Sequence, residues 1–136
     1  MIRYRKPVAG IERLLSTSTL IYGAPKVGKT TFVSTFPDVL LIECEPGGAD
    51  YVEGWIAEVG SLDELRNLWQ ELRARADSND FPWKLVAIDT IDAVVDWLAE
   101  EVALEFGRRD LLGPSVAFGA EWAKLRAAVL ACIKQF

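Results

Sequence analysis

Three short apolar runs divide the chain, at residues 19–22, 39–42 and 85–88. Each run is followed at once by a glycine or an acidic residue, namely Gly23, Glu43 and Asp89. Each run is apolar on both faces, which is typical of strands that are buried in a parallel sheet. We therefore expect three buried strands.

Between and after these runs, apolar residues recur at the spacing of an amphipathic helix. The first expected helix covers residues 29–36, and a capping box from Ser61 to Glu64 opens the second. The apolar positions of the three longer helices are Leu62, Leu65, Leu68, Trp69 and Leu72; Ile91, Val94, Val95, Leu98 and Val102; and, from about Ser115 on, Phe118, Trp122, Leu125, Val129 and Ile133. Strands that alternate with helices predict an α/β fold, with a parallel sheet covered by helices in a single domain over residues 1–136.

The loop after the first run matches the pattern G-x-x-x-x-G-K-[ST] at every fixed position. It consists of Gly23, Ala24, Pro25, Lys26, Val27, Gly28, Lys29 and Thr30, and Thr31 follows it. Glycines let the backbone turn so that its N–H groups, with the start of the next helix, attract phosphate oxygens. A glycine-rich turn can match by chance, but this one lies between an expected strand and an expected helix. We predict a site for a nucleoside triphosphate, with Lys29 at the β- and γ-phosphates and the Thr30 hydroxyl on Mg²⁺.

Acidic residues follow the other two runs. Asp89 ends the third run, at the edge of a parallel sheet where ligands bind, and a carboxylate there can hold the magnesium ion and its waters. The alternative is that Asp89 only caps the next helix. Glu43 and Glu45 follow the second run, and either could orient the attacking water, because side chains two apart in an extended chain point the same way. A solvated strand end is the alternative for this pair.

Charge and composition exclude several classes of protein. The net charge is −5, although residues 1–30 alone carry +5, so any contact with nucleic acid needs a local basic patch. The chain has no histidine, and its two cysteines, Cys44 and Cys132, form no metal-binding pattern, which argues against a zinc site or a Cys/His nucleophile. No apolar run approaches the ~20 residues that span a bilayer. We expect a cytoplasmic protein with no membrane partner.

Together, residues 20–31, 41–48 and 86–90 resemble the RecA-like P-loop ATPases. They are most similar to the phage nucleotide-binding ATPases of the AAA type that are related to single-strand-annealing recombinases. The resemblance implies an ATP- and Mg²⁺-dependent ATPase of phage DNA recombination that works in the host cytoplasm and can form a homo-oligomer. In that family the second strand ends in an acidic-x-Glu pattern whose last Glu activates water, which favours Glu45. The family's Asp before Ser or Thr matches Asp89 and Thr90.

The resemblance also implies a DNA-contacting loop after the helix that follows Asp89. Residues 107–119 occupy this position and contain Arg108, Arg109 and Phe118. Cations beside an aromatic ring can hold single-stranded DNA through phosphate contacts and stacking. A solvated charged loop is the alternative.

One feature departs from the family. There, a further strand with a polar sensor residue follows the last helix and lies between the first and third strands. The chain given ends at Phe136, before any such strand. Either the sequence is the N-terminal part of a RecA-like core, with hydrolysis expected of the full core, or the sheet has closed up so that the first and third strands are adjacent.

Two other functions remain open. One is a small-molecule P-loop kinase or other NTPase, although residues 89–92 lack the glycine of a GTPase and no Asn-Lys-x-Asp stretch occurs. The other is a nucleotide-binding domain that does not hydrolyse its ligand. Nucleotide preference and phosphate release separate these functions.

Overall fold

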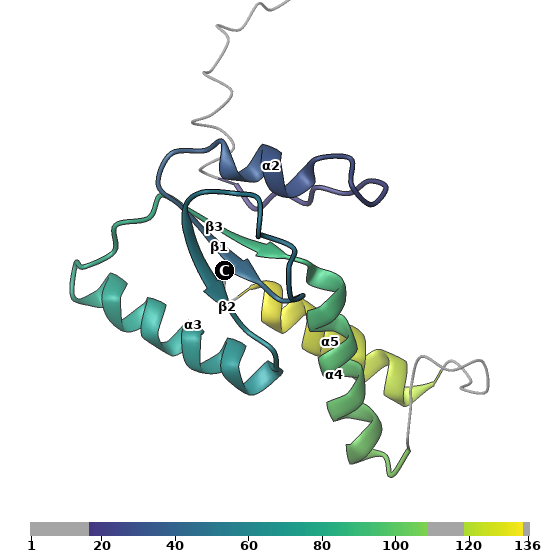
Figure 1. Ribbon diagram of the computed structural model, residues 1–136. Coiled ribbons are helices and arrows are strands. Elements are labelled where there is room, and N and C mark those ends of the chain that lie inside the picture. The colour runs from purple at the N-terminus through teal and green to yellow at the C-terminus, as the bar shows by residue number, and fades with distance from the viewer. Residues whose placement is uncertain (1–16, 109–118, 135–136) are drawn as a thin grey trace, which may run out of the picture.

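The fold is known from a computed structural model, which describes residues 17–108 and 119–134 (Figure 1). Along the chain the elements are α2 (Lys29–Ser34), β1 (Val39–Glu43), β2 (Trp55–Glu58), α3 (Leu62–Asp77), β3 (Leu85–Asp89), α4 (Ile91–Glu105) and α5 (Ala120–Ile133). The predicted α/β fold is confirmed: an open parallel sheet of three strands is flanked by helices, consistent with a P-loop NTPase fold.

The sheet has the order β2-β1-β3, and both pairings are parallel. All five residues of the central strand β1 are buried, whereas those of β3 are half-buried. The register places Glu43, the last residue of β1, beside Glu58 of β2 and Asp89 of β3. The carboxyl ends of all three strands therefore bring acidic residues to one edge of the sheet.

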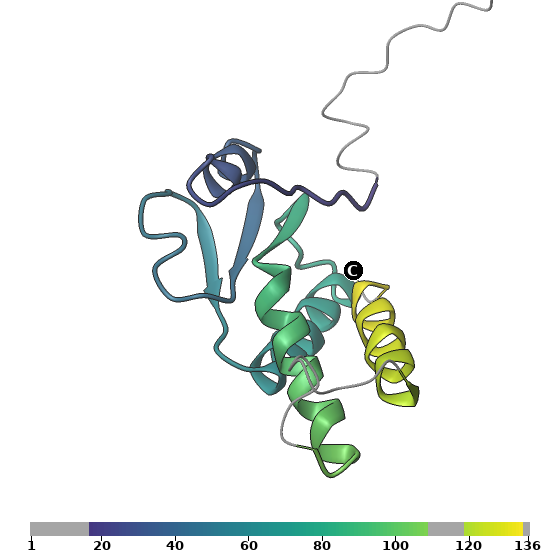
Figure 2. The same ribbon diagram turned by 90° about the vertical axis from the view of Figure 1, so that its right-hand side faces the viewer.

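The main core lies between one face of the sheet and the three long helices. Alternate β1 residues, Leu40 and Ile42, join buried side chains of α3, α4 and α5 in one apolar cluster. Ile42 and Val94, at 0% and 1% exposure, are its most deeply buried large side chains. In both views α4 and α5 run side by side on this face, while α2 lies apart from the three long helices (Figures 1 and 2).

The predicted apolar faces of α3 and α4 are confirmed, whereas α2 ends at Ser34 rather than at residue 36, and Ile133 of α5 is exposed. Leu65 and Leu72 of α3 are buried, as are Val94, Leu98 and Val102 of α4. The capping box forms with one difference: the Ser61 hydroxyl accepts from the Glu64 N–H, but Glu64 accepts from the N–H of Gly60 rather than of Ser61. Within the described residues, α5 begins at Ala120, and Ser115 and Phe118 lie outside them.

The first predicted strand is wrong. Residues 19–22 form no strand, and Leu20, Ile21 and Tyr22 are 73%, 37% and 88% exposed. A strand needs a neighbour to pair its backbone N–H and C=O groups. β1 has β2 and β3 on its two edges, and in the part of the chain described no strand pairs with the outer edge of β3. Of the two alternatives for the sheet, the closed-up one, with residues 19–22 beside β3, does not occur.

One strand was missed. β2 contains Trp55, Ile56 and Ala57 between Gly54 and Gly60, a β-prone run bounded by glycines that could have been recognised. It was hidden because its side chains are mostly exposed, unlike those of a strand in the middle of a parallel sheet. Among the described residues, no helix is both long and apolar enough to cross a membrane.

Candidate functional site

The phosphate loop adopts a backbone that its glycines make possible. Gly28, directly before α2, has a φ of 96°, a left-handed conformation that side chains with a Cβ rarely adopt. At Gly23 a Cβ would lie 3.2 Å from Cγ1 of Val27, so a larger residue would crowd the loop. Lys26 is also left-handed, with a φ of 63°. The loop therefore curls back on itself between residues 23 and 28.

The Lys29 ammonium closes this curl. Its Nζ donates to the backbone oxygens of Gly23 and Ala24, at 3.0 and 3.1 Å. Both bonds are exposed to solvent, so a stronger acceptor can replace them at little cost. Lys29 thus lies at the mouth of the loop, where its charge is available to an anion. The backbone oxygen of Thr31 accepts from Ser34 within α2.

Thr30 and Asp89 meet, although 59 positions separate them in the sequence. The Thr30 hydroxyl donates to Oδ2 of Asp89 at 2.5 Å in a partly buried place. A hydroxyl bonded to a carboxylate makes a short, charge-assisted hydrogen bond. The side chain expected to bind Mg²⁺ from the loop and the one expected from the third strand therefore lie next to each other.

Glu45 reaches the same edge of the sheet from β1. Its Oε1 accepts from the Thr90 hydroxyl at 2.9 Å, and Thr90 directly follows Asp89. Thr90 is the N-cap residue of α4, yet its side chain makes no capping bond to that helix. Thr90 was not among the predicted site residues. A hydroxyl directly after the acid of a strand end was the signal that could have identified it.

Glu43 has a different environment from Glu45. Its side chain belongs to a residue only 6% exposed, and Oε1 accepts from the N–H of Ala49 at 2.7 Å. This bond ties the end of β1 to the connection that leads to β2. The Glu43 carboxylate therefore satisfies a buried N–H and contributes to the fold, whereas the Glu45 side chain is exposed.

Cys44 lies between the two glutamates and is buried. Burial, followed by the nearby negative charges of Asp89 and Glu45, raises the pKa of its thiol to about 12. The thiol therefore stays protonated near neutral pH and cannot serve as a nucleophile.

A profile of the AAA domain family matches residues 16–136. The chain belongs to the AAA domain family. Searches of curated proteins and of solved structures found no match. Membership of this family of P-loop ATPase-like domains points to nucleotide binding. In this AAA domain the matched region contains the phosphate loop, the Thr30–Asp89 pair and Glu45.

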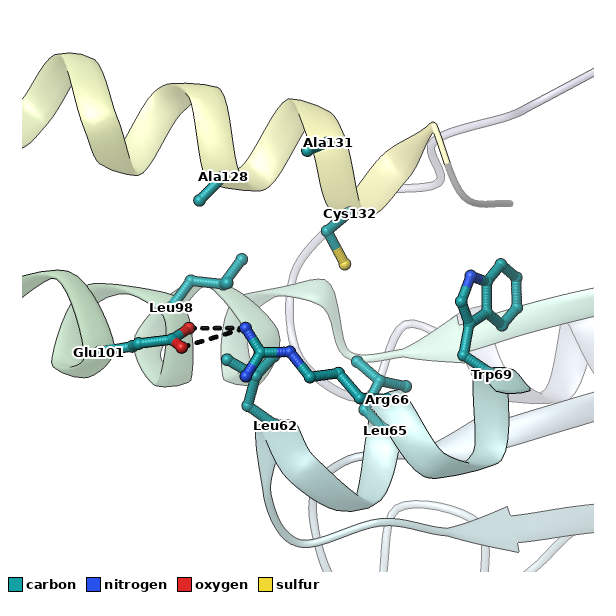
Figure 3. Close-up of a pocket in the computed structure, with 9 residues that line it drawn as sticks. All are labelled: Leu62, Leu65, Arg66, Trp69, Leu98, Glu101, Ala128, Ala131 and Cys132. Carbon is teal, nitrogen blue, oxygen red and sulfur yellow. Dashed lines mark hydrogen bonds and ion pairs between the residues drawn. The ribbon is translucent and has the colours of Figure 1, made fainter. Parts of the chain in front are cut away.

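A hollow in the described part of this AAA domain lies elsewhere, between α3, α4 and α5 (Figure 3). Its volume is about 200 Å³, and apolar side chains of all three helices line most of it. Arg66 and Glu101 also line it, and the Arg66 guanidinium donates to both carboxylate oxygens of Glu101, at 3.1 and 2.8 Å. The Cys132 sulfur points toward the space between α5 and α3 (Figure 3). Among the described residues that line this groove, the one cation, Arg66, is already paired with a carboxylate, so the groove has little to offer a triphosphate.

The proposed DNA-binding residues are only partly described. The Arg108 guanidinium forms an ion pair with Glu121 at the start of α5, with 2.7 Å between Nη2 and Oε1. Its charge is thus partly neutralised by a side chain that is 13% exposed. Arg109 and Phe118 lie outside the described residues.

The two glutamates should separate in a stability measurement. We expect Glu43→Ala to lower the free energy of unfolding by about 1–3 kcal/mol, because it leaves the buried N–H of Ala49 without its acceptor. Glu45→Ala should change it by less than about 0.5 kcal/mol, as is usual for an exposed side chain. Urea unfolding followed by tryptophan fluorescence measures both. Equal losses in the two variants would contradict these separate roles.

Proposed function

We propose that this AAA domain binds ATP with Mg²⁺ and hydrolyses it, and that it serves DNA recombination or single-strand annealing in a phage. The contact between Thr30 and Asp89 is the observation that carries the nucleotide part of the proposal. It joins a hydroxyl of the phosphate loop to a carboxylate at the end of the neighbouring strand, which is the pair of groups that a P-loop ATPase uses around its metal.

The phosphates are assigned to residues 23–31, with Lys29 as the principal cation. In the structure its ammonium donates to two exposed backbone oxygens. Phosphate oxygens carry full negative charge and form stronger hydrogen bonds than neutral carbonyls. The exchange of these acceptors would let Lys29 move to the β- and γ-phosphates without breaking any buried contact.

The oxygen atoms at Thr30 and Asp89 fit Mg²⁺. No group of three or more His, Cys, Asp or Glu residues able to hold a metal occurs among residues 17–108 and 119–134. Mg²⁺ suits such a site, because it usually keeps several waters and takes one or two protein oxygens together with substrate phosphates. The bound ion would neutralise charge on the phosphates. Thr30 and Asp89 would hold it directly or through its waters.

Glu45 is the residue that we assign to the attacking water. Its side chain is exposed, and its carboxylate accepts a hydrogen bond from Thr90, the residue directly after Asp89. Glu43 cannot take this role without losing its bond to Ala49. This choice agrees with the acidic-x-Glu pattern of the RecA-like ATPases.

The DNA role rests on the resemblance and on the position of Arg108 and Arg109 after α4. We assign single-stranded DNA as the partner of this segment, with Phe118 available for stacking and with side-by-side assembly of copies adding to the affinity. Because Arg108 is paired with Glu121, a phosphate must compete with a carboxylate for it.

Removal of the loop cation tests nucleotide binding. Lys29→Ala should weaken ATP binding by about tenfold to a hundredfold, because a charge-assisted hydrogen bond to phosphate is lost. Isothermal titration calorimetry measures the affinity. Lys84→Ala is the matched control, because Lys84 is an exposed lysine paired with Asp38 and should bind like the parent. Equal affinities of the parent and Lys29→Ala would overturn the assignment of the phosphate loop.

Removal of the Asp89 charge tests the metal. Asp89→Asn keeps the size of the side chain and an oxygen that can accept from Thr30, but it loses the charge that attracts a cation. We expect ATP affinity in the presence of Mg²⁺ to fall by about tenfold, with a much smaller change in EDTA. Asp92→Asn, an exposed position in the first turn of α4, is the control. Equal changes with and without the metal would mean that Asp89 serves only the fold.

Two substitutions at one ion pair test the DNA role. Arg108→Ala should weaken binding of a labelled single-stranded oligonucleotide, and Glu121→Gln should strengthen it by releasing the Arg108 charge. Both effects should shrink as salt is added, because the contact is electrostatic. Fluorescence anisotropy with and without a non-hydrolysable ATP analogue measures them. If the three binding curves coincide, Arg108 is not part of a DNA site.

A further inference from the structure

The Thr90 hydroxyl is used in an unusual way. Threonine is common at the N-cap of a helix because its side-chain oxygen accepts from a free backbone N–H of the first turn. Ser61 does this for α3, accepting from the N–H of Glu64 at 3.3 Å. Thr90 occupies the same position in α4, with the extended backbone of an N-cap, but its hydroxyl makes no such bond and donates to Glu45 instead. The contact with Glu45 therefore takes the place of a contact that would stabilise the helix.

The sheet holds the backbone next to Glu45, whereas the Glu45 side chain is exposed. The N–H of Cys44 donates to the backbone oxygen of Asp89 at 2.7 Å, so pairing between the two strand ends continues up to the residue before Glu45. Figure 1 shows the ends of β1 and β3 together where α4 begins. The exposed Glu45 side chain has several rotatable bonds, and without a hydrogen-bond partner it would sample many rotamers. The bond from Thr90 selects the rotamers that direct the carboxylate toward β3.

Asp89 and Thr90 then face two partners at once. Asp89 accepts from Thr30 of α2, and Thr90 donates to Glu45 after β1. These two consecutive residues connect the phosphate loop, the strand end and the exposed glutamate. A change at Thr90 can therefore alter Glu45 without touching the loop.

We propose that Thr90 is a positioning residue, which holds Oε1 of Glu45 so that the second carboxylate oxygen, Oε2, faces the attacking water. This inference rests on the proposed function. In the reaction a water proton passes to Oε2 while the water oxygen bonds to the γ-phosphorus. The bond from that phosphorus to the β–γ bridging oxygen breaks, which yields ADP and phosphate. Thr90 itself loses no proton and forms no bond.

The position of Thr90 predicts a particular kinetic pattern. Thr90→Val removes the hydroxyl at nearly constant size and should lower kcat about tenfold, because a poorly placed base costs rate, with KM changed less than about twofold. Thr90→Ser keeps a hydroxyl and should stay within about twofold of the parent in both constants. Thr90→Ala is the second variant if valine disturbs the start of α4. Thr35→Val is the matched control, because the Thr35 hydroxyl donates to a backbone oxygen of α2.

A double-mutant cycle distinguishes positioning from a structural effect. If Thr90 acts through Glu45, then Thr90→Val should cause no further loss of turnover in a Glu45→Gln background. An effect on folding or on the phosphate loop would persist there. Additive losses would overturn the inference.

A second readout does not need turnover. In protein labelled with ¹³C at the glutamate side-chain carboxyl, the signal that disappears in Glu45→Gln belongs to Glu45. We expect this signal to shift in Thr90→Val and Thr90→Ala and to keep its parental position in Thr90→Ser and Thr35→Val. An unchanged signal in Thr90→Val would mean that Thr90 does not hold the carboxylate, and it would overturn the inference.

The two readouts keep this inference apart from the proposed function. If the parent hydrolyses ATP and Glu45→Gln does not, but Thr90→Val behaves like the parent, the proposed function stands and the inference fails. If the parent shows no turnover, the proposal that this domain hydrolyses ATP by itself fails. If the parent turns over and Glu45→Gln retains all of that turnover, the assignment of Glu45 to the water is wrong. The NMR signal then decides whether Thr90 positions the side chain.

Discussion

A hydrogen bond between the Thr30 hydroxyl and the Asp89 carboxylate connects the phosphate loop to the sheet. Residues 19–22, which precede the loop, pair with no strand in the described part of the chain. The loop leads directly into α2, which contacts β1 and is bonded to the end of β3 through Thr30. A short hydrogen bond between a hydroxyl and a carboxylate is directional. It therefore constrains both the orientation of the phosphate loop and its distance from the end of β3. The proposed metal site is this same contact.

Parallel register explains why so many acidic residues gather here without disrupting the fold. β1 and β3 end level with each other, which puts Glu43 beside Asp89 at the edge of the sheet. Three of these carboxylates have their own hydrogen-bond donor: the N–H of Ala49 for Glu43, the Thr30 hydroxyl for Asp89 and the Thr90 hydroxyl for Glu45. Donors to carboxylates offset the repulsion between like charges and the loss of hydration. The edge can therefore keep a strongly negative character that would attract a cation.

Only part of this arrangement could be predicted from residues that are close together in the sequence. The phosphate-loop pattern, the helical faces of α3 and α4, and an acid at the end of β3 are recognisable because each depends on residues close together in the sequence. The expected strand at residues 19–22 had the same apolar signature as β1, but it is exposed and unpaired. Apolar composition records a preference for burial, whereas a strand also requires a neighbouring edge with free N–H and C=O groups. β2 shows the reverse case, since it is paired to β1 although its side chains are mostly exposed.

The two glutamates show most clearly the difference between what local sequence determines and what tertiary structure determines. The sequence by itself determined that Glu43 and Glu45 lie at the end of a buried strand, at one edge of a parallel sheet. It could not distinguish them, because side chains two positions apart in a strand point the same way. Only the tertiary structure decided between them. The connection to β2 folds back so that Ala49 donates to Glu43, and β3 brings Thr90 to Glu45. These partners lie 6 and 45 positions away. No local pattern contains them, because a hydrogen bond depends on where two segments meet in space rather than on the residues beside either one.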